Sequence, residues 1–237
     1  MKVYLISEPR LDYAEFDRFI KDEGMPAGSA YHVEPASDAE CLVELSARLC
    51  YMSYGKGRTT TKECLANIIR QKHFSVLEHA NFTFIITGVS RSLTHELVRH
   101  RHLSFSQLSQ RYVDESNAAM VIPEGIRHES PEVHLLWKAA VLEAQGAYKG
   151  LLDLLAAAPG THVSTADKKW IRQCARSVLP NAIETKIAVT GNARAWLEFI
   201  GKRASPAADP EIRNLAACIY GILLAKYPSL FTPEEVE

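Results

Sequence analysis

The spacing of apolar residues changes along the chain, and an alternating pattern marks the strands. Residues 2–6 alternate weakly between apolar and polar side chains and predict a first strand. Residues 81–88, with the sequence NFTFIITG, are β-branched and aromatic and end at a glycine, which predicts a buried strand. Residues 184–191, with the sequence ETKIAVTG, predict a third strand.

Helical spacing, with apolar residues three and four positions apart, covers most of the remaining chain. Leu42, Leu45 and Leu49 follow Ser37, a residue type that favours the position before a helix. The same reasoning predicts helices at 62–72 and at 168–178. Helical spacing through Val89, Leu93 and Leu97 predicts another helix, with Ser90 or Ser92 as its cap. Two more are predicted after Asn192 and after Asp209, the latter with Pro210 at the first helical position. The first 35 residues predict only a strand and a loop.

The clearest predicted element is a long amphipathic helix at about 130–158. Ser130 is its expected N-cap, Pro131 takes the first helical position and Gly160 lies past the end. Its apolar stripe contains Val133, Leu136, Trp137, Ala140, Val141, Ala144, Tyr148, Leu151, Leu152 and Leu155. We expect this helix to be a scaffold or a subunit interface.

The few predicted strands are separated by helices, which indicates the fold class. We expect an α+β or mixed α/β fold in which helices dominate and flank a small, central mixed sheet. The length of 237 residues fits one large domain, residues 1–237, with the long helix as a segment of it.

The composition is that of an ordinary soluble globular protein. Of the residues, 47% are hydrophobic and 23% are charged, and the formal net charge is −1. This balance gives no reason to expect nucleic acid or an acidic membrane as a partner. No stretch approaches the ~18 apolar residues of a membrane span.

The N-terminus and the cysteines favour a cytoplasmic location. The first apolar run is broken by Glu8 and Pro9 and is too short for the core of a signal peptide. The five cysteines are scattered without a C-x-x-C pair, which argues against a disulfide scaffold and against a cysteine-rich zinc site.

Residues 99–112, with the sequence RHRHLSFSQLSQRY, concentrate cationic and hydroxyl groups. Arg99 and Arg101 lie at the end of a predicted helix, and no apolar period explains the serines in the loop at 104–109. Guanidinium groups match the oxygens of phosphate, and serine hydroxyls can complete the coordination of an anion. The stretch therefore favours a phosphate pocket, whereas cations that merely complement a helix dipole are the structural alternative.

The histidines in this region are a weak metal signal. His95 and Glu96 begin a zincin-like H-E-x-x-H pattern, but Arg99 takes the place of the second histidine. His100 is five residues from His95, about 500° around a helix, so the two do not share one face. Neither a Walker loop nor a G-x-G-x-x-G fingerprint is present.

A second group of arginines, Arg172, Arg176, Arg194 and Arg203, surrounds the third predicted strand and the helix that follows it. Arg203 continues the apolar stripe of Trp196, Phe199 and Ile200, so its charge must reach water, a partner anion or a ligand. The preferred interpretation of Asn192 is the N-cap of the following helix. Because a helix N-terminus can also bind an anion, a ligand contact is the second interpretation.

The ordered motifs resemble those of the flavin-dependent thymidylate synthases. The hallmark of that family is R-H-R followed by seven residues and a serine, which here corresponds to Arg99 to Arg101 and Ser109. The resemblance continues through HFSVLEH, SQLSQRY, ARSVLPNAIET and TGNARAW, and it covers roughly residues 35–230.

The resemblance implies an enzyme of dTMP biosynthesis. Members transfer the methylene carbon of 5,10-methylenetetrahydrofolate to dUMP, with FAD carrying electrons from NADPH, and release dTMP and tetrahydrofolate. They are homotetramers whose active sites form between subunits. This reaction needs no metal, and the flavin-free synthases use a cysteine nucleophile that the serine loop here lacks.

The resemblance also implies roles for individual residues. Flavin contacts fall on Ser75, Glu78, Arg99, His100, Arg101, Gln107, Asn192, Ala193 and Arg194. The nucleotide is expected at Glu96, Leu97, Val98, Arg99, Gln107, Leu108, Ser109, Gln110, Arg111, Arg176 and Arg203. Arg203 matches the residue that activates uracil, while Glu198 and Ser106 depart from the family pattern.

Two other functions stay open on the residues alone. A nucleic-acid-binding module would use the basic stretch at 99–112 for backbone and base contacts, although no aromatic platform accompanies it. A metallohydrolase would use the histidines, and their helical angles make it the weaker of the two. Bound flavin in the purified protein distinguishes the enzyme from both.

Overall fold

The computed structural model describes residues 1–25, 36–158 and 164–232. Contacts divide the chain into two compact units, which are described separately. The first unit contains residues 1–2, 86–99 and 105–188, and the second contains residues 3–85, 100–104 and those from 189 onward. The single domain expected from the sequence stays a prediction.

A small sheet combines four strands in the order β1-β2-β4-β3. The strands are β1 (Lys2–Ser7), β2 (Asn81–Ser90), β3 (Ser104–Gln107) and β4 (Glu184–Asn192). The Arg91 N–H donates to the Ile183 carbonyl and the Ala193 N–H to the Ala80 carbonyl, so β2 and β4 run antiparallel. The helix-dominated α+β class is confirmed, but the sheet is antiparallel where a mixed one was expected.

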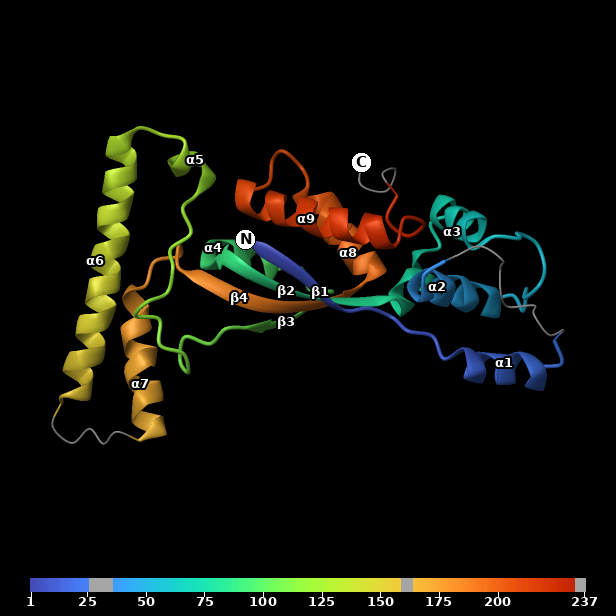
Figure 1. The fold of residues 1–237 in the computed structure, drawn as a ribbon, viewed down its shortest axis with the longest axis horizontal. Coiled ribbons are helices and arrows are strands. Elements are labelled where there is room, and N and C mark those ends of the chain that lie inside the picture. Colours follow the sequence, from blue (N-terminus) through green and yellow to red (C-terminus); the bar gives the residue numbers. More distant parts are fainter. Residues whose placement is uncertain (26–35, 159–163, 233–237) are drawn as a thin grey trace. The chain divides into compact units, whose positions relative to one another are not determined.

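In the second unit, helices pack around aromatic side chains. They are α1 (Tyr13–Asp22), α2 (Asp38–Leu49), α3 (Thr61–Arg70), the 3₁₀ helix η1 (Phe74–His79), α8 (Ala193–Arg203) and α9 (Pro210–Lys226), and Figure 1 shows α9 alongside α8. The fully buried Trp196 meets Phe84 edge-on at 5.0 Å between ring centroids, and its indole N–H donates to the Phe82 carbonyl. Asn192 caps α8 as predicted.

Helix α1 corrects the expectation that the first 35 residues hold only a strand and a loop. The Asp12 side chain accepts hydrogen bonds from the backbone N–H groups of Ala14 and Glu15 and begins the helix. Phe16 and Phe19 then pack against Tyr54, a residue far along the chain. The helix is stabilised by this tertiary contact, which a local apolar period does not reveal.

The first unit contains α4 (Arg91–Leu97), α5 (Glu124–Arg127), α6 (Pro131–Ala156), α7 (Thr165–Ala175) and the 3₁₀ helix η2 (Arg176–Val178). Helix α6 confirms the predicted long helix and lies alongside α7 (Figure 1). Its stripe is only partly covered, because Val141 and Tyr148 are buried whereas Leu136 is 74% exposed. Gly160 lies outside the described residues.

Among the described residues, no helix is both long enough and apolar enough to cross a membrane.

Candidate active site

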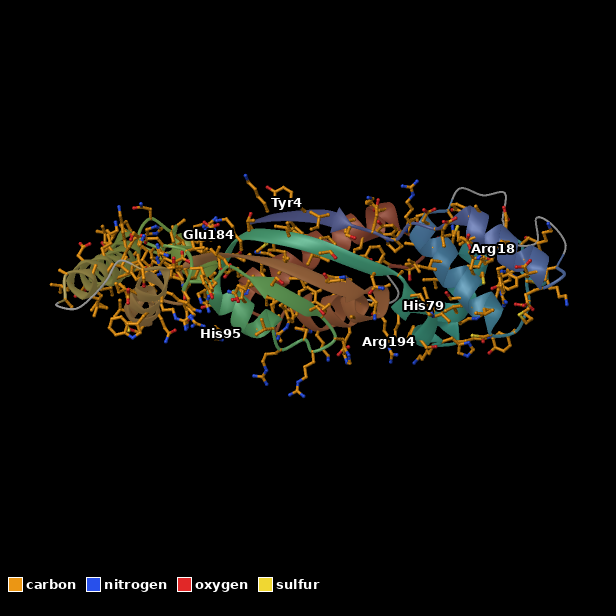
Figure 2. The ribbon with its side chains drawn as sticks, turned by 90° about the horizontal axis from the view of Figure 1, so that it is seen from below. Tyr4, Arg18, His79, His95, Glu184 and Arg194 are labelled. Atoms are coloured by element: carbon orange, nitrogen blue, oxygen red, sulfur yellow. The ribbon has the colours of Figure 1, made fainter. Side chains whose placement is uncertain are left out.

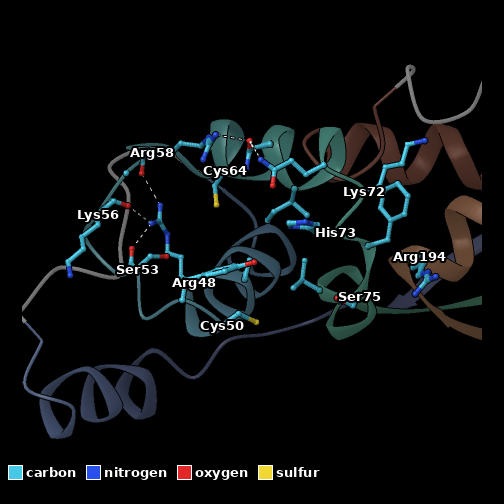
Figure 3. Close-up of a pocket in the computed structure, with 18 residues that line it drawn as sticks. Arg48, Cys50, Ser53, Lys56, Arg58, Cys64, Lys72, His73, Ser75 and Arg194 are labelled. Atoms are coloured by element: carbon cyan, nitrogen blue, oxygen red, sulfur yellow. Dashed lines mark hydrogen bonds between the residues drawn. The ribbon is translucent and has the colours of Figure 1, made fainter.

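A cavity of about 710 Å³ in the second unit has several cationic and small polar side chains in its wall, beside apolar ones such as Ile68 and Phe74 (Figure 3). Its charged or titratable lining residues are Arg48, Lys56, Arg58, Lys72, His73 and Arg194, together with Cys50, Cys64 and Tyr51. None of the described residues that line it carries a carboxylate. The lining therefore favours an anionic ligand.

The walls of this cavity come from α2, α3, η1, the start of α8 and the segment 50–58. The segment turns sharply, because Met52, Gly55 and Gly57 have positive φ angles of 44°, 67° and 78°. Gly57 lines the cavity and has no atom within 4 Å of where a Cβ would stand, so backbone conformation rather than space explains the glycine.

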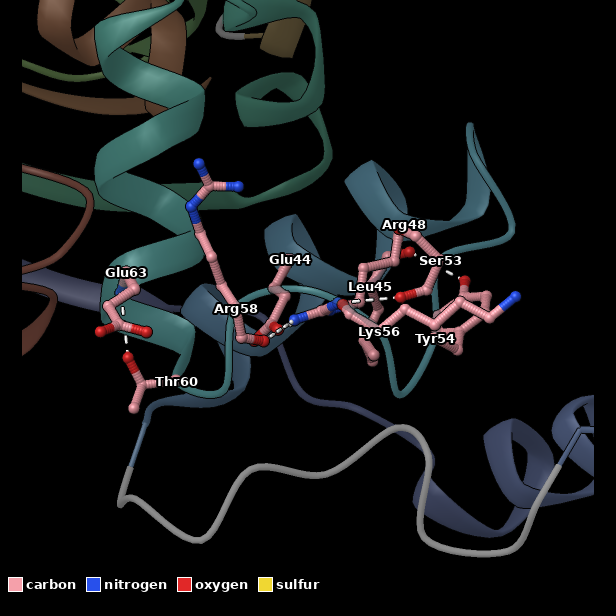
Figure 4. A network of polar contacts seen from close by, with 9 residues as sticks. All are labelled: Glu44, Leu45, Arg48, Ser53, Tyr54, Lys56, Arg58, Thr60 and Glu63. Carbon is pink, nitrogen blue, oxygen red and sulfur yellow. Dashed lines mark hydrogen bonds and ion pairs between the residues drawn. The ribbon is translucent and has the colours of Figure 1, made fainter.

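Arg48 is a lining residue that the sequence did not indicate (Figure 4). Its side chain is 5% exposed and pairs with Glu44, which is 2% exposed, at 2.7 Å between Nε and Oε1. Its Nη1 donates to the carbonyls of Ser53 and Lys56, and its Nη2 donates to the carbonyl of Arg58. A helical arginine one turn after a glutamate ordinarily indicates an ion pair on the protein surface. The sequence position of Arg48 therefore did not indicate a buried residue of a site.

Three of the predicted flavin residues lie together at this cavity. Ser75 and Arg194 line it, and the Arg194 Nη1 is 2.6 Å from Glu78 Oε1. Figure 2 shows Arg194 close to His79, at the end of the 3₁₀ helix that carries Ser75 and Glu78. The side chains of Glu78 and Arg194 are about half exposed, at 48% and 54%, so a ligand can reach both.

Asn192 and Ala193 have hydrogen bonds within the fold. The Asn192 Oδ1 accepts from the Ala195 N–H at 2.9 Å, as an N-cap does. Ala193 is fully buried and its N–H donates to the Ala80 carbonyl. These two residues start α8 and thereby set the place of Arg194.

His100 and Arg203 contact each other directly. Arg203 Nε donates to His100 Nε2 at 2.9 Å, so the imidazole accepts this bond in its neutral form. The His100 ring also meets Phe199 edge-on at 5.0 Å between centroids. Burial and the nearby charges of Arg203 and Lys202 lower the pKa of His100. Arg101, by contrast, is exposed.

In the first unit, Gln107 is tied to its surroundings through its amide. The Gln107 Nε2 donates to the hydroxyls of Thr94 and Thr185 at 3.1 and 3.3 Å. Residues 104–107 form β3, which corrects the predicted loop, and the Leu108 N–H extends the pairing to the carbonyl of Lys186. Leu97 is fully buried, so its side chain belongs to the core.

Residues 109–111 form a turn whose polar groups face inward. The Arg111 N–H donates to Ser109 Oγ at 3.3 Å, and Gln110 is only 7% exposed. Arg111 Nε is buried and has no hydrogen-bond partner within the described residues. A buried guanidinium nitrogen without a partner favours binding of an acceptor such as a phosphate oxygen.

Arg91 is a second residue that sequence reasoning missed. Burial, the larger cause, and the charge of Arg176 lower the pKa of Arg91. Glu115 lies near Arg91, is 3% exposed and has an Oε1 without a partner in the described chain. Arg91 is the first residue of α4, after the Ser90 cap. An arginine at such a position is usually exposed to solvent, so the sequence did not single it out.

The predicted residues therefore fall into two groups. The second unit holds Ser75, Glu78, His100, Arg101, Asn192, Ala193, Arg194 and Arg203, and the first holds Glu96, Leu97, Val98, Arg99, Gln107, Leu108, Ser109, Gln110, Arg111 and Arg176. Among the described residues, no group of three or more His, Cys, Asp or Glu side chains can hold a metal ion.

Comparison with known proteins gives the family. Residues 33–229 match the model of the thymidylate synthase complementing protein family. The chain belongs to this family. A family relative from Mycolicibacterium gilvum (strain PYR-GCK) is 50% identical over 211 residues, which cover 86% of this chain and 84% of the relative. One from Mycobacterium tuberculosis (strain ATCC 25177 / H37Ra) is 47% identical over 205 residues, covering 85% and 82%. Both are named flavin-dependent thymidylate synthase.

The range matched to the thymidylate synthase complementing protein family contains every residue that the sequence resemblance assigned, from Ser75 to Arg203. Glu198, a departure from the expected pattern, pairs with Lys202 at 2.5 Å. That hydrogen bond lowers the pKa of Glu198, so the side chain is an anion beside the helix end that carries Arg203.

Proposed function

We propose that the chain is a flavin-dependent thymidylate synthase that converts dUMP to dTMP. The carbon comes from 5,10-methylenetetrahydrofolate, and NADPH supplies the electrons through FAD. The observation that carries this proposal is the cation-lined cavity, at which Ser75, Glu78 and Arg194 lie together. The name shared by the mycobacterial relatives supports the same activity.

The donors at this cavity fit a flavin dinucleotide. FAD carries a diphosphate, and the described lining residues provide several cations and no carboxylate. Ser75, Glu78, Asn192, Ala193 and Arg194 would hold it, and the resemblance assigns further flavin contacts to Arg99, His100, Arg101 and Gln107. A bound FAD would supply the redox chemistry, because a methylene group becomes a methyl group only with two added electrons.

The nucleotide is proposed to bind through its phosphate at Ser109 and Arg111. The partnerless Arg111 Nε and the Ser109 hydroxyl form a donor pair suited to phosphate. Gln107 and Gln110 belong to the same segment, and Arg176 adds a cation whose charge lowers the pKa of Arg91. Glu96, Val98 and Leu108 would contact the nucleotide as flanking residues of α4 and β3.

Arg203 is proposed to activate the uracil ring. Loss of the N3 proton places negative charge on the ring and makes C5 nucleophilic, and a guanidinium near O4 and N3 stabilises that charge. His100 accepts the Arg203 Nε–H and is kept neutral by its lowered pKa. His100 therefore orients the guanidinium without adding a competing charge.

We further propose a homotetramer with active sites shared between subunits, located in the cytoplasm. The partly uncovered apolar side chains of α6, with Leu135, Leu136 and Leu154 at 65%, 74% and 73% exposure, support a subunit contact on this helix. Balanced charge and scattered free cysteines support the location.

Flavin content tests the proposal. The purified protein, or the protein after addition of FAD, should be yellow and should release flavin absorbance on denaturation. Colourless protein that also fails to bind added FAD would exclude the proposal. For the nucleotide site, Arg111→Ala should weaken dUMP binding far more than deoxyuridine binding, and equal losses would argue against a phosphate contact.

A further inference from the structure

We propose that Arg48 is a positioning residue for the cavity. It holds the segment 53–58, which brings Lys56 and Arg58 to the cavity wall, and so preorganises the wall for an anionic ligand. That the ligand is FAD rests on the proposed function. The holding of the segment does not, because it follows from contacts within the chain.

The geometry of this contact requires an arginine. One planar guanidinium donates to three backbone carbonyls, those of Ser53, Lys56 and Arg58, at 2.9, 2.9 and 2.8 Å. Its Nε is meanwhile fixed by Glu44. Lysine has one ammonium and lacks the rigid fork that reaches both sides of a turn.

The segment needs such a contact because it has little other backbone pairing. It forms neither helix nor strand, and two of its glycines have positive φ angles. Carbonyls that face inward must find donors, and Arg48, buried beneath them, supplies three. The Arg48 side chain therefore satisfies three carbonyls of the segment at once and is one of the contacts that set its conformation.

Tyr54 fixes the same segment independently. Its hydroxyl donates to the Leu45 carbonyl at 2.9 Å, and its ring packs edge-on against Phe16 and Phe19 of α1. Arg48 and Tyr54 thus tie the segment to the same helix, α2, through different groups. Removing the arginine should loosen residues 55–58 while Tyr54 stays in place.

The cations that depend on this contact belong to the cavity. Ser53, Lys56, Gly57 and Arg58 all line it, and Arg58 Nη2 reaches Asn67 Oδ1 at 2.6 Å (Figure 3). A mobile segment would have to be ordered again each time a ligand binds. Preorganisation removes that cost, so losing Arg48 should weaken ligand binding without touching the chemistry.

Limited trypsin digestion of the full-length chain, with and without FAD, tests this proposal. Trypsin cuts after Lys56 and Arg58, and mass spectrometry of early fragments gives the rate at these two bonds. In Arg48→Lys, cleavage there should be about tenfold faster or more, since at least one hydrogen bond to a charged group is lost. The dissociation constant for FAD should rise by about tenfold, and kcat at saturating FAD should change less than twofold.

Two further variants separate positioning from general damage. The double variant Glu44→Gln with Arg48→Met leaves no unpaired buried charge and should show the same fast cleavage. Glu40→Gln is the matched control, because Glu40 is a buried glutamate of α2 that accepts from the Ser37 and Ser229 N–H groups and does not line the cavity. It should keep the wild-type cleavage pattern and FAD affinity.

The outcomes are distinct. Wild-type cleavage rates in both Arg48 variants would overturn the proposal, as would fast cleavage with unchanged FAD affinity, or Glu40→Gln behaving like Arg48→Lys. If the wild-type chain binds no FAD at all, the proposed function fails, while the cleavage rates still decide whether Arg48 holds the segment.

Discussion

Replacing Arg203 by alanine should separate chemistry from flavin binding. Arg203 Nε is 2.9 Å from His100 Nε2, and the residue does not line the cation-rich cavity. If its guanidinium stabilises charge on the uracil ring, its loss should lower kcat by about 10²–10³-fold, the range seen when one oxyanion donor is removed. The affinity for FAD should change little.

The same substitution should be visible at His100. The charge of Arg203 is the second largest cause, after burial, of the lowered pKa of His100. Arg203→Ala should therefore raise that pKa toward about 6.5, the value of an unperturbed histidine. An NMR titration of the imidazole against pH measures the change.

Lys202 offers a matched control for this experiment. It is the adjacent cation, it pairs with Glu198 at the surface, and it lowers the pKa of His100 less than Arg203 does. Lys202→Ala should keep kcat within about twofold and raise the pKa of His100 only slightly. Wild-type turnover in Arg203→Ala, or an equal loss in Lys202→Ala, would refute the role assigned to Arg203.

Three further predictions concern other parts of the chain. Arg194→Ala should raise the dissociation constant for FAD about tenfold, yet change the free energy of unfolding by less than about 1 kcal/mol, because its ion pair is exposed. Gly191→Ala should destabilise the chain by about 1–3 kcal/mol in urea unfolding, since a Cβ would lie 2.3 Å from Leu103 Cδ2, whereas Gly201→Ala, with open space in α8, should stabilise it by about 0.5–1 kcal/mol. Burial raises the pKa of Glu115, so the folded chain keeps a proton that the unfolded chain has released above about pH 4.3. Stability is then lost as pH rises from there to the raised pKa, and Glu115→Gln should show a smaller loss; identical pH profiles would contradict this assignment.

The sequence predicted most of the helices and three of the strands because their apolar periods and caps are local. Ser37 and Asn192 accept hydrogen bonds at helix N-termini as expected. Helix α1 was missed because Phe16 and Phe19 find their partner in Tyr54, which no local pattern shows. Strand β3 was missed because four serine-rich residues acquire their backbone pairing only from the sheet.

The sequence predicted those site residues that belong to a recognisable motif. It missed those whose role depends on their burial in the fold. Ser75, Glu78 and Arg194 are far apart in the sequence, and only the resemblance linked them before the fold did. Arg48 has an ordinary i, i+4 glutamate partner in the sequence. Its contacts with three carbonyls depend on a turn that is formed five to ten residues later.

The central claim is reductive methylation of dUMP with a flavin, and one labelled turnover experiment tests it most directly. FAD-loaded protein is mixed without oxygen with dUMP, NADPH and 5,10-methylenetetrahydrofolate labelled at the methylene carbon. Labelled dTMP and an equal amount of tetrahydrofolate should form, and both should depend on FAD. Unlabelled product, no dTMP, dihydrofolate in equal amount, or turnover that persists after flavin is removed would contradict it.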